Sequence, residues 1–118
     1  MKGALERLVD LVLKNDEYDP WIDSIDPIEA LETVEEEVKE LRRELEIGNF
    51  ENIEEEMGDL LWTVFIVLSV LKRKGFDPDR IVEKLEGKMK KRKPYIFEGK
   101  RVDLEQAKRI WRMAKGEG

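Results

Sequence analysis

Helix start and stop signals recur along the whole sequence, and they restrict the fold more than any other feature of the chain. Asp or Asn stands where helices would begin, twice directly before Pro, and Gly or Pro stands where they would end. With apolar residues at helical spacing, these signals predict helices over about residues 3–14, 26–46, 77–93 and 103–115, and a further helix that begins near residues 49–52 and ends at Gly75. Either Asn49 or Asn52 can cap this helix, the third along the chain.

The fold class follows from these segments. No alternating apolar and polar stretch bounded by turn residues is present, so we expect no sheet. We place Pro20 and Trp21 in a loop between the first two helices. The prediction is an all-α protein, a helical bundle of four to five helices.

The length and composition indicate one domain that folds in water. With 118 residues, of which 41% are hydrophobic and 42% charged, we expect a single domain over residues 1–118. The longest apolar run, Leu60–Leu71, is too short to cross a bilayer, which takes about 20 residues. The segment Met1–Arg7 lacks the apolar core of a signal peptide, so we expect a cytoplasmic protein.

Two residue types are absent, and their absence limits the chemistry. The sequence contains no cysteine, which excludes disulfides, thiolate metal sites and a cysteine nucleophile. It also contains no histidine, the commonest general base and transition-metal ligand. Any bound metal must therefore have oxygen ligands, which are typical of Mg²⁺ and Mn²⁺.

Charge is divided unevenly along the chain. Residues 1–59 carry a net charge of −14 and residues 60–118 a net charge of +8, within a total of −6. Such a chain can offer a cation-binding region and an anion-binding region to one ligand. The alternative, which charge alone favours, is that the two halves neutralise each other on the surface.

Four acidic residues stand at matching positions on two consecutive predicted helices. The second helix has an apolar stripe that includes Val34 and Val38, and Glu37 and Glu40 lie to one side of it. Glu56 and Asp59 occupy the same angular offsets beside the stripe of the third helix. When the stripes pack together, the four carboxylates can converge and favour a divalent cation. The alternative remains open that they belong to a solvated Glu-rich face.

Motifs in a fixed order give the chain a resemblance to a known family. Glu36-Glu37-Val38-Lys39-Glu40, a gap, and then Glu56-Met57-Gly58-Asp59 is similar to the EExxE…ExxD signature of MazG-type nucleoside triphosphate pyrophosphohydrolases. Pro20-Trp21, the basic segment 88–97, and Trp111 with Lys115 follow the family's order as well. Two positions depart from the family pattern: Ile22 replaces the acid of Pro-Trp-Asp, and Ile25-Asp26 replaces a frequent Gln-Thr.

The resemblance implies a fold, a reaction and a set of site residues. It implies the all-α nucleoside triphosphate pyrophosphatase fold, with the core completed in a homodimer or tetramer. The implied reaction is Mg²⁺-dependent cleavage between the α- and β-phosphates, giving nucleoside monophosphate and pyrophosphate, with Mn²⁺ as a possible substitute. The resemblance assigns Glu37, Glu40, Glu56 and Asp59 to metal, Lys88, Lys91 and Arg92 to the phosphates, and Trp111 and Lys115 to the surroundings of the base.

A carboxylate is the natural proton acceptor in a chain without histidine. Glu36 and Glu37 are the candidates for this catalytic role. Trp111 has an alternative interpretation as a packing residue, and the basic segment has one as a solvated helix end. As competing functions we retain a non-catalytic dimeric helical adaptor and nucleic-acid binding through the basic half. The acidic total charge and the lack of a known nucleic-acid fold argue against nucleic acid as a partner.

Overall fold

The computed structural model describes residues 1–116, and helices are the regular secondary structure of that range. The helices are α1 (Ala4–Tyr18), α2 (Trp21–Ser24), α3 (Pro27–Ile47), α4 (Phe50–Arg73), α5 (Pro78–Arg92), α6 (Pro94–Phe97) and α7 (Leu104–Ala114). The described residues contain no strand, so the all-α prediction is confirmed. None of these helices is long and apolar enough to cross a membrane.

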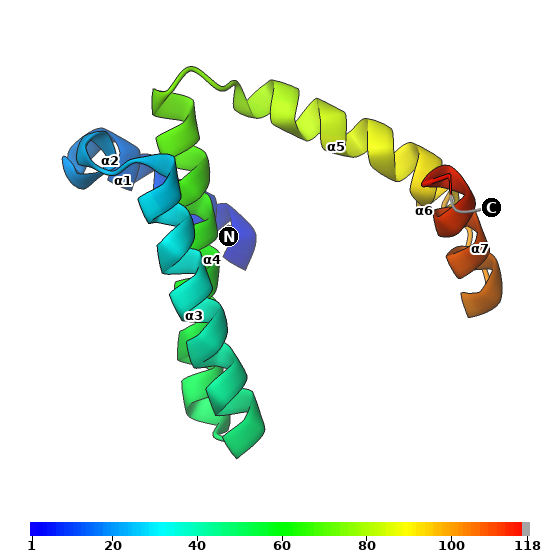
Figure 1. The fold of residues 1–118 in the computed structure, drawn as a ribbon, viewed down its shortest axis with the longest axis horizontal. Coiled ribbons are helices and arrows are strands. Elements are labelled where there is room, and N and C mark those ends of the chain that lie inside the picture. Colours follow the sequence, from blue (N-terminus) through cyan, green and yellow to red (C-terminus); the bar gives the residue numbers. More distant parts are fainter. Residues whose placement is uncertain (117–118) are drawn as a thin grey trace. The chain divides into compact units, whose positions relative to one another are not determined.

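The long helices α3 and α4 form an antiparallel hairpin and lie side by side (Figure 1). Asp26 caps α3 by accepting a hydrogen bond from the Glu29 amide at 2.9 Å, as its place before Pro27 predicts. Gly48 ends the helix with a φ of 82°, a left-handed conformation that glycine adopts at low cost. Asn49, rather than Asn52, caps α4. Local signals therefore set the hairpin turn.

A small core joins α1 and α2 to this hairpin. Each of the first four helices contributes one buried apolar residue, namely Val12, Ile22, Ala30 and Val70. The Arg73 guanidinium, at the end of α4, donates to Asp23 Oδ1 at 2.9 Å and to the carbonyl oxygen of Asp16. These contacts hold the end of α1 and the short helix α2 against α4.

The segment before α3 differs from its prediction. The first helix extends to Tyr18 instead of ending at Lys14, and Pro20–Trp21 leads into a helical turn rather than a loop. Asp19 Oδ1 accepts the Trp21 amide at 3.0 Å and so starts α2. Residues 15–18 carry no apolar repeat, and the contacts from Arg73, far away in the sequence, account for their order.

The chain forms two compact units, and the boundary between them in the sequence falls between Phe76 and Asp77. In the second unit, α6 and α7 both contact α5. Asp103 and Gln106 form the capping box that the sequence predicts for α7, with the Gln106 amide 2.9 Å from Asp103 Oδ1. The one-turn helix α6 was not predicted; it begins at Pro94, which fits the first turn of a helix. The single-domain assignment over residues 1–118 stays a prediction.

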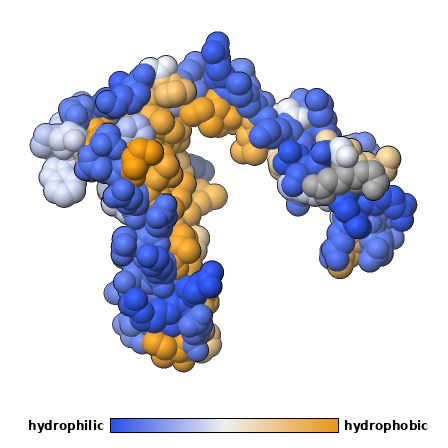
Figure 2. Space-filling view, in the orientation of Figure 1, coloured by the Kyte–Doolittle hydropathy of each residue, from blue (hydrophilic) through white to orange (hydrophobic). Residues whose placement is uncertain are grey.

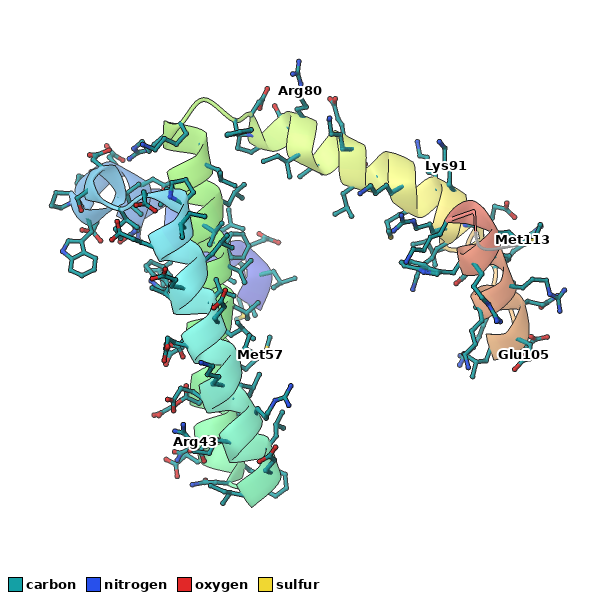
Figure 3. All side chains as sticks on the ribbon, in the orientation of Figure 1. Arg43, Met57, Arg80, Lys91, Glu105 and Met113 are labelled. Carbon is teal, nitrogen blue, oxygen red and sulfur yellow. The ribbon has the colours of Figure 1, made fainter. Side chains whose placement is uncertain are left out.

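Apolar side chains remain exposed along the hairpin. Figure 2 shows hydrophobic residues gathered on the α4 side of the first unit. The exposed apolar residues of the hairpin include Met57 and Val64 of α4, the latter 49% exposed, and Val38 and Leu45 of α3. Figure 3 marks Met57 and Arg43 on this hairpin, and Lys91, Glu105 and Met113 in the second unit. Within the first unit, residues 1–76, these apolar side chains remain exposed.

Candidate metal centre and nucleotide-binding surfaces

Three of the four predicted metal ligands come together between α3 and α4. Glu37, Glu56 and Asp59 each offer a carboxylate oxygen, and these oxygens all lie within 4.8 Å of one another. Glu37 and Glu56 are half-buried, and Asp59 is exposed. The i, i+3 spacing puts Glu56 and Asp59 on one face of α4, and the antiparallel hairpin sets that face against Glu37.

The spacing of these oxygens fits a small divalent cation. Octahedral Mg²⁺ with bonds of about 2.1 Å holds neighbouring ligand oxygens about 3 Å apart and opposite ones about 4.2 Å apart. Carboxylates within 4.8 Å can reach such positions through small side-chain rotations. A donor set made only of carboxylate oxygens suits Mg²⁺ or Mn²⁺, and the residues present therefore fit this metal.

The electrostatics of Glu56 agree with a site that needs a cation. Desolvation raises the pKa of its carboxyl group above the usual value of 4.5, and a side-chain hydrogen bond with Glu37 raises it further. The negative charges of Glu37, Asp59 and Glu40 act in the same direction. A divalent cation would relieve this repulsion by replacing the proton that the raised pKa favours.

Two predicted acidic residues stand apart from this group. Glu40 is half-buried on α3, and its Oε2 accepts a hydrogen bond from Arg43 Nη1 at 2.9 Å. Its charge still acts on Glu56, so it lies in the same electrostatic neighbourhood. Glu36 is exposed on α3. The metal role of Glu40 and the catalytic role of Glu36 stay predictions.

The second unit brings several cations around one aromatic ring. The Arg92 guanidinium lies 5.0 Å from the centre of the Trp111 ring, and the ammonium groups of Lys93 and Lys115 lie at 5.7 and 5.9 Å. The helices α5 and α7 thus bring Arg92 and Lys115 close to Trp111, and the substrate-binding role of these residues stays a prediction. Lys88 and Lys91 are exposed on α5. These cations form a surface suited to an anionic ligand.

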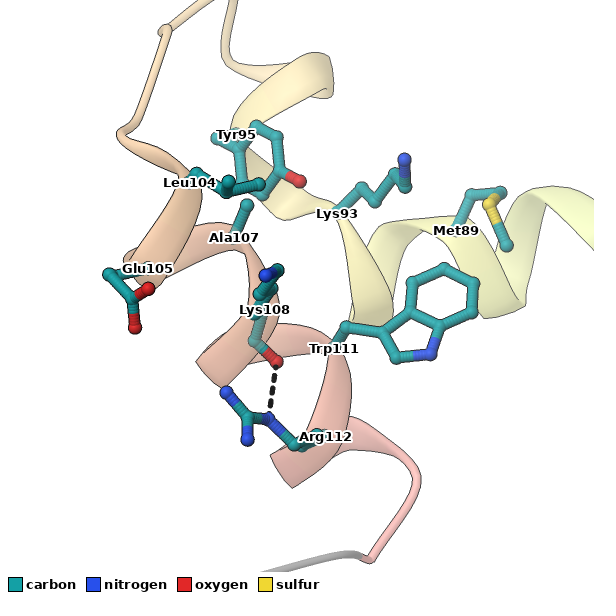
Figure 4. Close-up of a pocket in the computed structure, with 9 residues that line it drawn as sticks. All are labelled: Met89, Lys93, Tyr95, Leu104, Glu105, Ala107, Lys108, Trp111 and Arg112. Carbon is teal, nitrogen blue, oxygen red and sulfur yellow. Dashed lines mark hydrogen bonds between the residues drawn. The ribbon is translucent and has the colours of Figure 1, made fainter.

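An open hollow of about 860 Å³ adjoins this ring (Figure 4). Met89, Lys93, Tyr95, Leu104, Glu105, Ala107, Lys108, Trp111 and Arg112 line it. Trp111 is half-buried, so its indole both packs and remains accessible. The interpretations of Trp111 as a packing residue and as a substrate contact are therefore compatible.

A smaller cavity, which the sequence analysis missed, lies within the first unit. Its volume is about 160 Å³, and it is lined by Asn15, Asp19, Trp21, Ile22, Ile25, Ala30, Thr33, Trp62, Thr63 and Ile66. A local signal existed for part of it, because Thr33 precedes Glu37 by one helical turn and Thr63 follows Asp59 by one turn. No local signal existed for Asn15, since only the packing of α1 on the hairpin brings it there.

Comparison with known proteins identifies a family of metal-dependent nucleotide hydrolases, for which an all-α fold and clustered carboxylates are expected. Residues 26–97 match the model of the MazG nucleotide pyrophosphohydrolase domain, and the chain belongs to that family. The matched segment contains all the predicted acidic site residues together with Lys88, Lys91 and Arg92, and it ends before Trp111 and Lys115.

Among solved structures, the chain is similar to a MazG-related protein from Thermotoga maritima. The two are 28% identical and superpose with a TM-score of 0.82, over 94% of this chain and 98% of the other. No curated protein matches the sequence. The structural match extends beyond residues 26–97 and supports the same fold for nearly the whole chain.

Proposed function

We propose that the protein hydrolyses nucleoside triphosphates between the α- and β-phosphates and releases nucleoside monophosphate and pyrophosphate. The observation that carries this proposal is the group of Glu37, Glu56 and Asp59 on the α3–α4 hairpin of a MazG-family chain. The reaction adds one water across the phosphoanhydride bond. The hydroxyl group stays on one phosphorus, and the bridging oxygen leaves with the other.

The carboxylates of the hairpin would hold the metal. Glu37, Glu56 and Asp59 provide the first ligands, and we propose Glu40 as a fourth after it leaves Arg43. Mg²⁺ or Mn²⁺ at this site would neutralise phosphate charge and favour ionisation of a water. We propose Glu36 or Glu37 as the acceptor of the water's proton.

The cations of the second unit are proposed to bind the substrate. Lys88, Lys91 and Arg92 are assigned to the phosphates, because guanidinium and ammonium groups form strong charge-assisted hydrogen bonds with phosphate oxygens. Trp111 and Lys115 are proposed nucleotide contacts in the same cluster, and the distance of 5.0 Å between Arg92 and the Trp111 ring supports a joint role.

A homodimer, or a tetramer built from it, is the proposed assembly. Val38, Leu45, Met57 and Val64 leave an exposed apolar face on the hairpin, and such faces on soluble proteins commonly mark subunit interfaces. A second copy of the chain would bury this face. We further propose that the protein acts in the cytoplasm, where its nucleotide substrates occur.

The direct test is a panel of ribo- and deoxyribonucleoside triphosphates with Mg²⁺, with products separated by anion exchange. The expected products are monophosphate and pyrophosphate in equal amounts, and EDTA should abolish their formation. Release of diphosphate and orthophosphate would refute the assigned bond. Absence of turnover in a protein that still forms dimers would instead indicate the helical adaptor.

A further inference from the structure

Arg43 on α3 is paired with an acid of the candidate metal centre. Its Nη1 donates a hydrogen bond to Glu40 Oε2 at 2.9 Å, and the two charges form an ion pair. Glu40 lies near enough to the converging carboxylates for its charge to act on Glu56. Arg43 also belongs to the same compact unit as these carboxylates. The guanidinium therefore stands at the border of the metal centre.

This pairing accounts for the position of Glu40 outside the group of three carboxylates. Helical spacing puts Glu40 one turn after Glu37, on the same side of α3. The carboxylate oxygens of Glu37, Glu56 and Asp59 converge to within 4.8 Å of one another. Glu40 Oε2 is directed to Arg43 instead. Turning Glu40 toward the other three ligands takes its carboxylate away from the guanidinium, so a metal ion and Arg43 compete for it.

The ion pair is weak enough to be exchanged. The Arg43 side chain is 60% exposed, and that of Glu40 is 39% exposed. Water screens the attraction between charges at such positions, and an exposed pair shifts an equilibrium by about fivefold or less. A divalent cation held by three further carboxylates attracts Glu40 more strongly than one exposed guanidinium does. Metal binding therefore favours the release of Arg43.

A released Arg43 has the chemistry that phosphate oxygens need. Its guanidinium carries five N–H donors in a planar fork, which can bind two phosphate oxygens at once. The four predicted ligands carry more negative charge than one divalent cation neutralises, so the site would repel phosphates without a further cation. Arg43 provides this positive charge from the same helix that carries Glu37 and Glu40.

We propose that Arg43 is a phosphate-binding residue of this site and that Glu40 blocks it until the metal binds. In the metal-free protein, Glu40 accepts the hydrogen bond from Arg43. When Glu40 joins the metal ligands, the guanidinium is released and donates to phosphate oxygens of the substrate. Metal binding thus strengthens phosphate binding, and the two are positively coupled. The inference rests on the proposed function and adds to its substrate site a residue outside the EExxE…ExxD signature.

The first measurement is metal binding without nucleotide. Mn²⁺ binding can be followed by the loss of the EPR signal of the free ion. Arg43→Gln removes the competitor for Glu40, so this variant should bind Mn²⁺ about two- to fivefold more tightly than the parent. Arg42→Gln is the matched control, because it removes the same charge from the neighbouring exposed position. Two residues turn an α-helix by about 200°, so Arg42 points away from Glu40, and its loss should change the Mn²⁺ affinity by less than about twofold.

The second measurement is anion binding in saturating Mg²⁺, with pyrophosphate as the probe in isothermal titration. Arg43→Gln should weaken pyrophosphate binding about tenfold, as expected for the loss of a charge-assisted hydrogen bond, and Arg42→Gln by less than about twofold. Arg43→Gln thus changes the two affinities in opposite directions. Misfolding would weaken both affinities, and a long-range effect of the lost charge would be similar in both variants.

The proposal is overturned by any of three results. These are an Mn²⁺ affinity of Arg43→Gln that is equal to or lower than that of the parent, an unchanged pyrophosphate affinity, and equal effects of the Arg42 and Arg43 substitutions. The two measurements do not depend on turnover. If triphosphates are not hydrolysed while both shifts in affinity appear, the proposed function fails and the role of Arg43 in phosphate binding stands.

Discussion

Replacing Glu56 by Gln removes one charge from the group of three carboxylates while keeping the shape of the side chain. The pKa of Glu56 is raised in the folded protein, so the native state binds a proton more readily than the unfolded state does. The ionised carboxylate therefore destabilises the metal-free native state at neutral pH. Glu56→Gln, which carries no charge, should melt at a temperature equal to or above that of the parent in EDTA.

Addition of Mg²⁺ should reverse this order. A ligand that binds only the native state, at 100 times its Kd, stabilises that state by about 2.7 kcal/mol. For a chain of this size, 1 kcal/mol shifts the melting temperature by about 4 °C, so the parent should gain about 10 °C. The variant, with one of three converging ligands lost, should gain much less. The two melting curves should therefore cross between EDTA and saturating Mg²⁺.

Turnover provides the matching functional measurement. Pyrophosphate release by Glu56→Gln should fall at least about a hundredfold, a common result when an electrostatic element of a transition state is removed. Glu55→Gln is the matched control, because Glu55 is the neighbouring acid on α4, is exposed and is not part of the carboxylate group. It should keep parental turnover and the full response to Mg²⁺. Parental turnover of Glu56→Gln, or equal responses of both variants to Mg²⁺, would refute the metal assignment.

Three further outcomes are expected. The metal-free parent should gain stability as the pH falls from neutrality through the raised pKa of Glu56 toward 4.5. Glu56→Gln has no carboxyl group at this position and should lack this part of the gain. Equal pH profiles of the two proteins in thermal melts would contradict this prediction. Ile22→Asp restores the family's acid but buries a charge at a position only 2% exposed. The free energy of unfolding, measured by chemical denaturation, should therefore fall by more than about 2 kcal/mol. A denaturation midpoint equal to that of the parent would contradict this prediction. Val64→Glu should reduce the oligomer to a monomer with unchanged helicity; an unchanged mass by light scattering would contradict the apolar interface.

Much of the fold follows from signals that act within a few residues. Asp26 before Pro27, Gly48 and the Asp103–Gln106 pair each satisfy or terminate backbone groups of the adjacent helix, so the sequence alone places the boundaries of α3 and α7 within two residues. The meeting of Glu37 with Glu56 and Asp59 was also predictable. It requires only helical spacing and an antiparallel hairpin, and the short turn at Gly48 favours such a hairpin.

Contacts between residues distant in sequence decided the rest. Arg73 orders the end of α1 and α2 through Asp16 and Asp23, about fifty residues earlier, and no local signal marks that pairing. The same packing brings Asn15 to the cavity wall and buries Ile22, where the family pattern has an acid. Helix caps and periodicity depend on neighbours along the chain, whereas a cavity depends on how faces of several helices fit together. The sequence therefore predicts the helices and the carboxylate pairs, and only tertiary packing creates the cavity of the first unit.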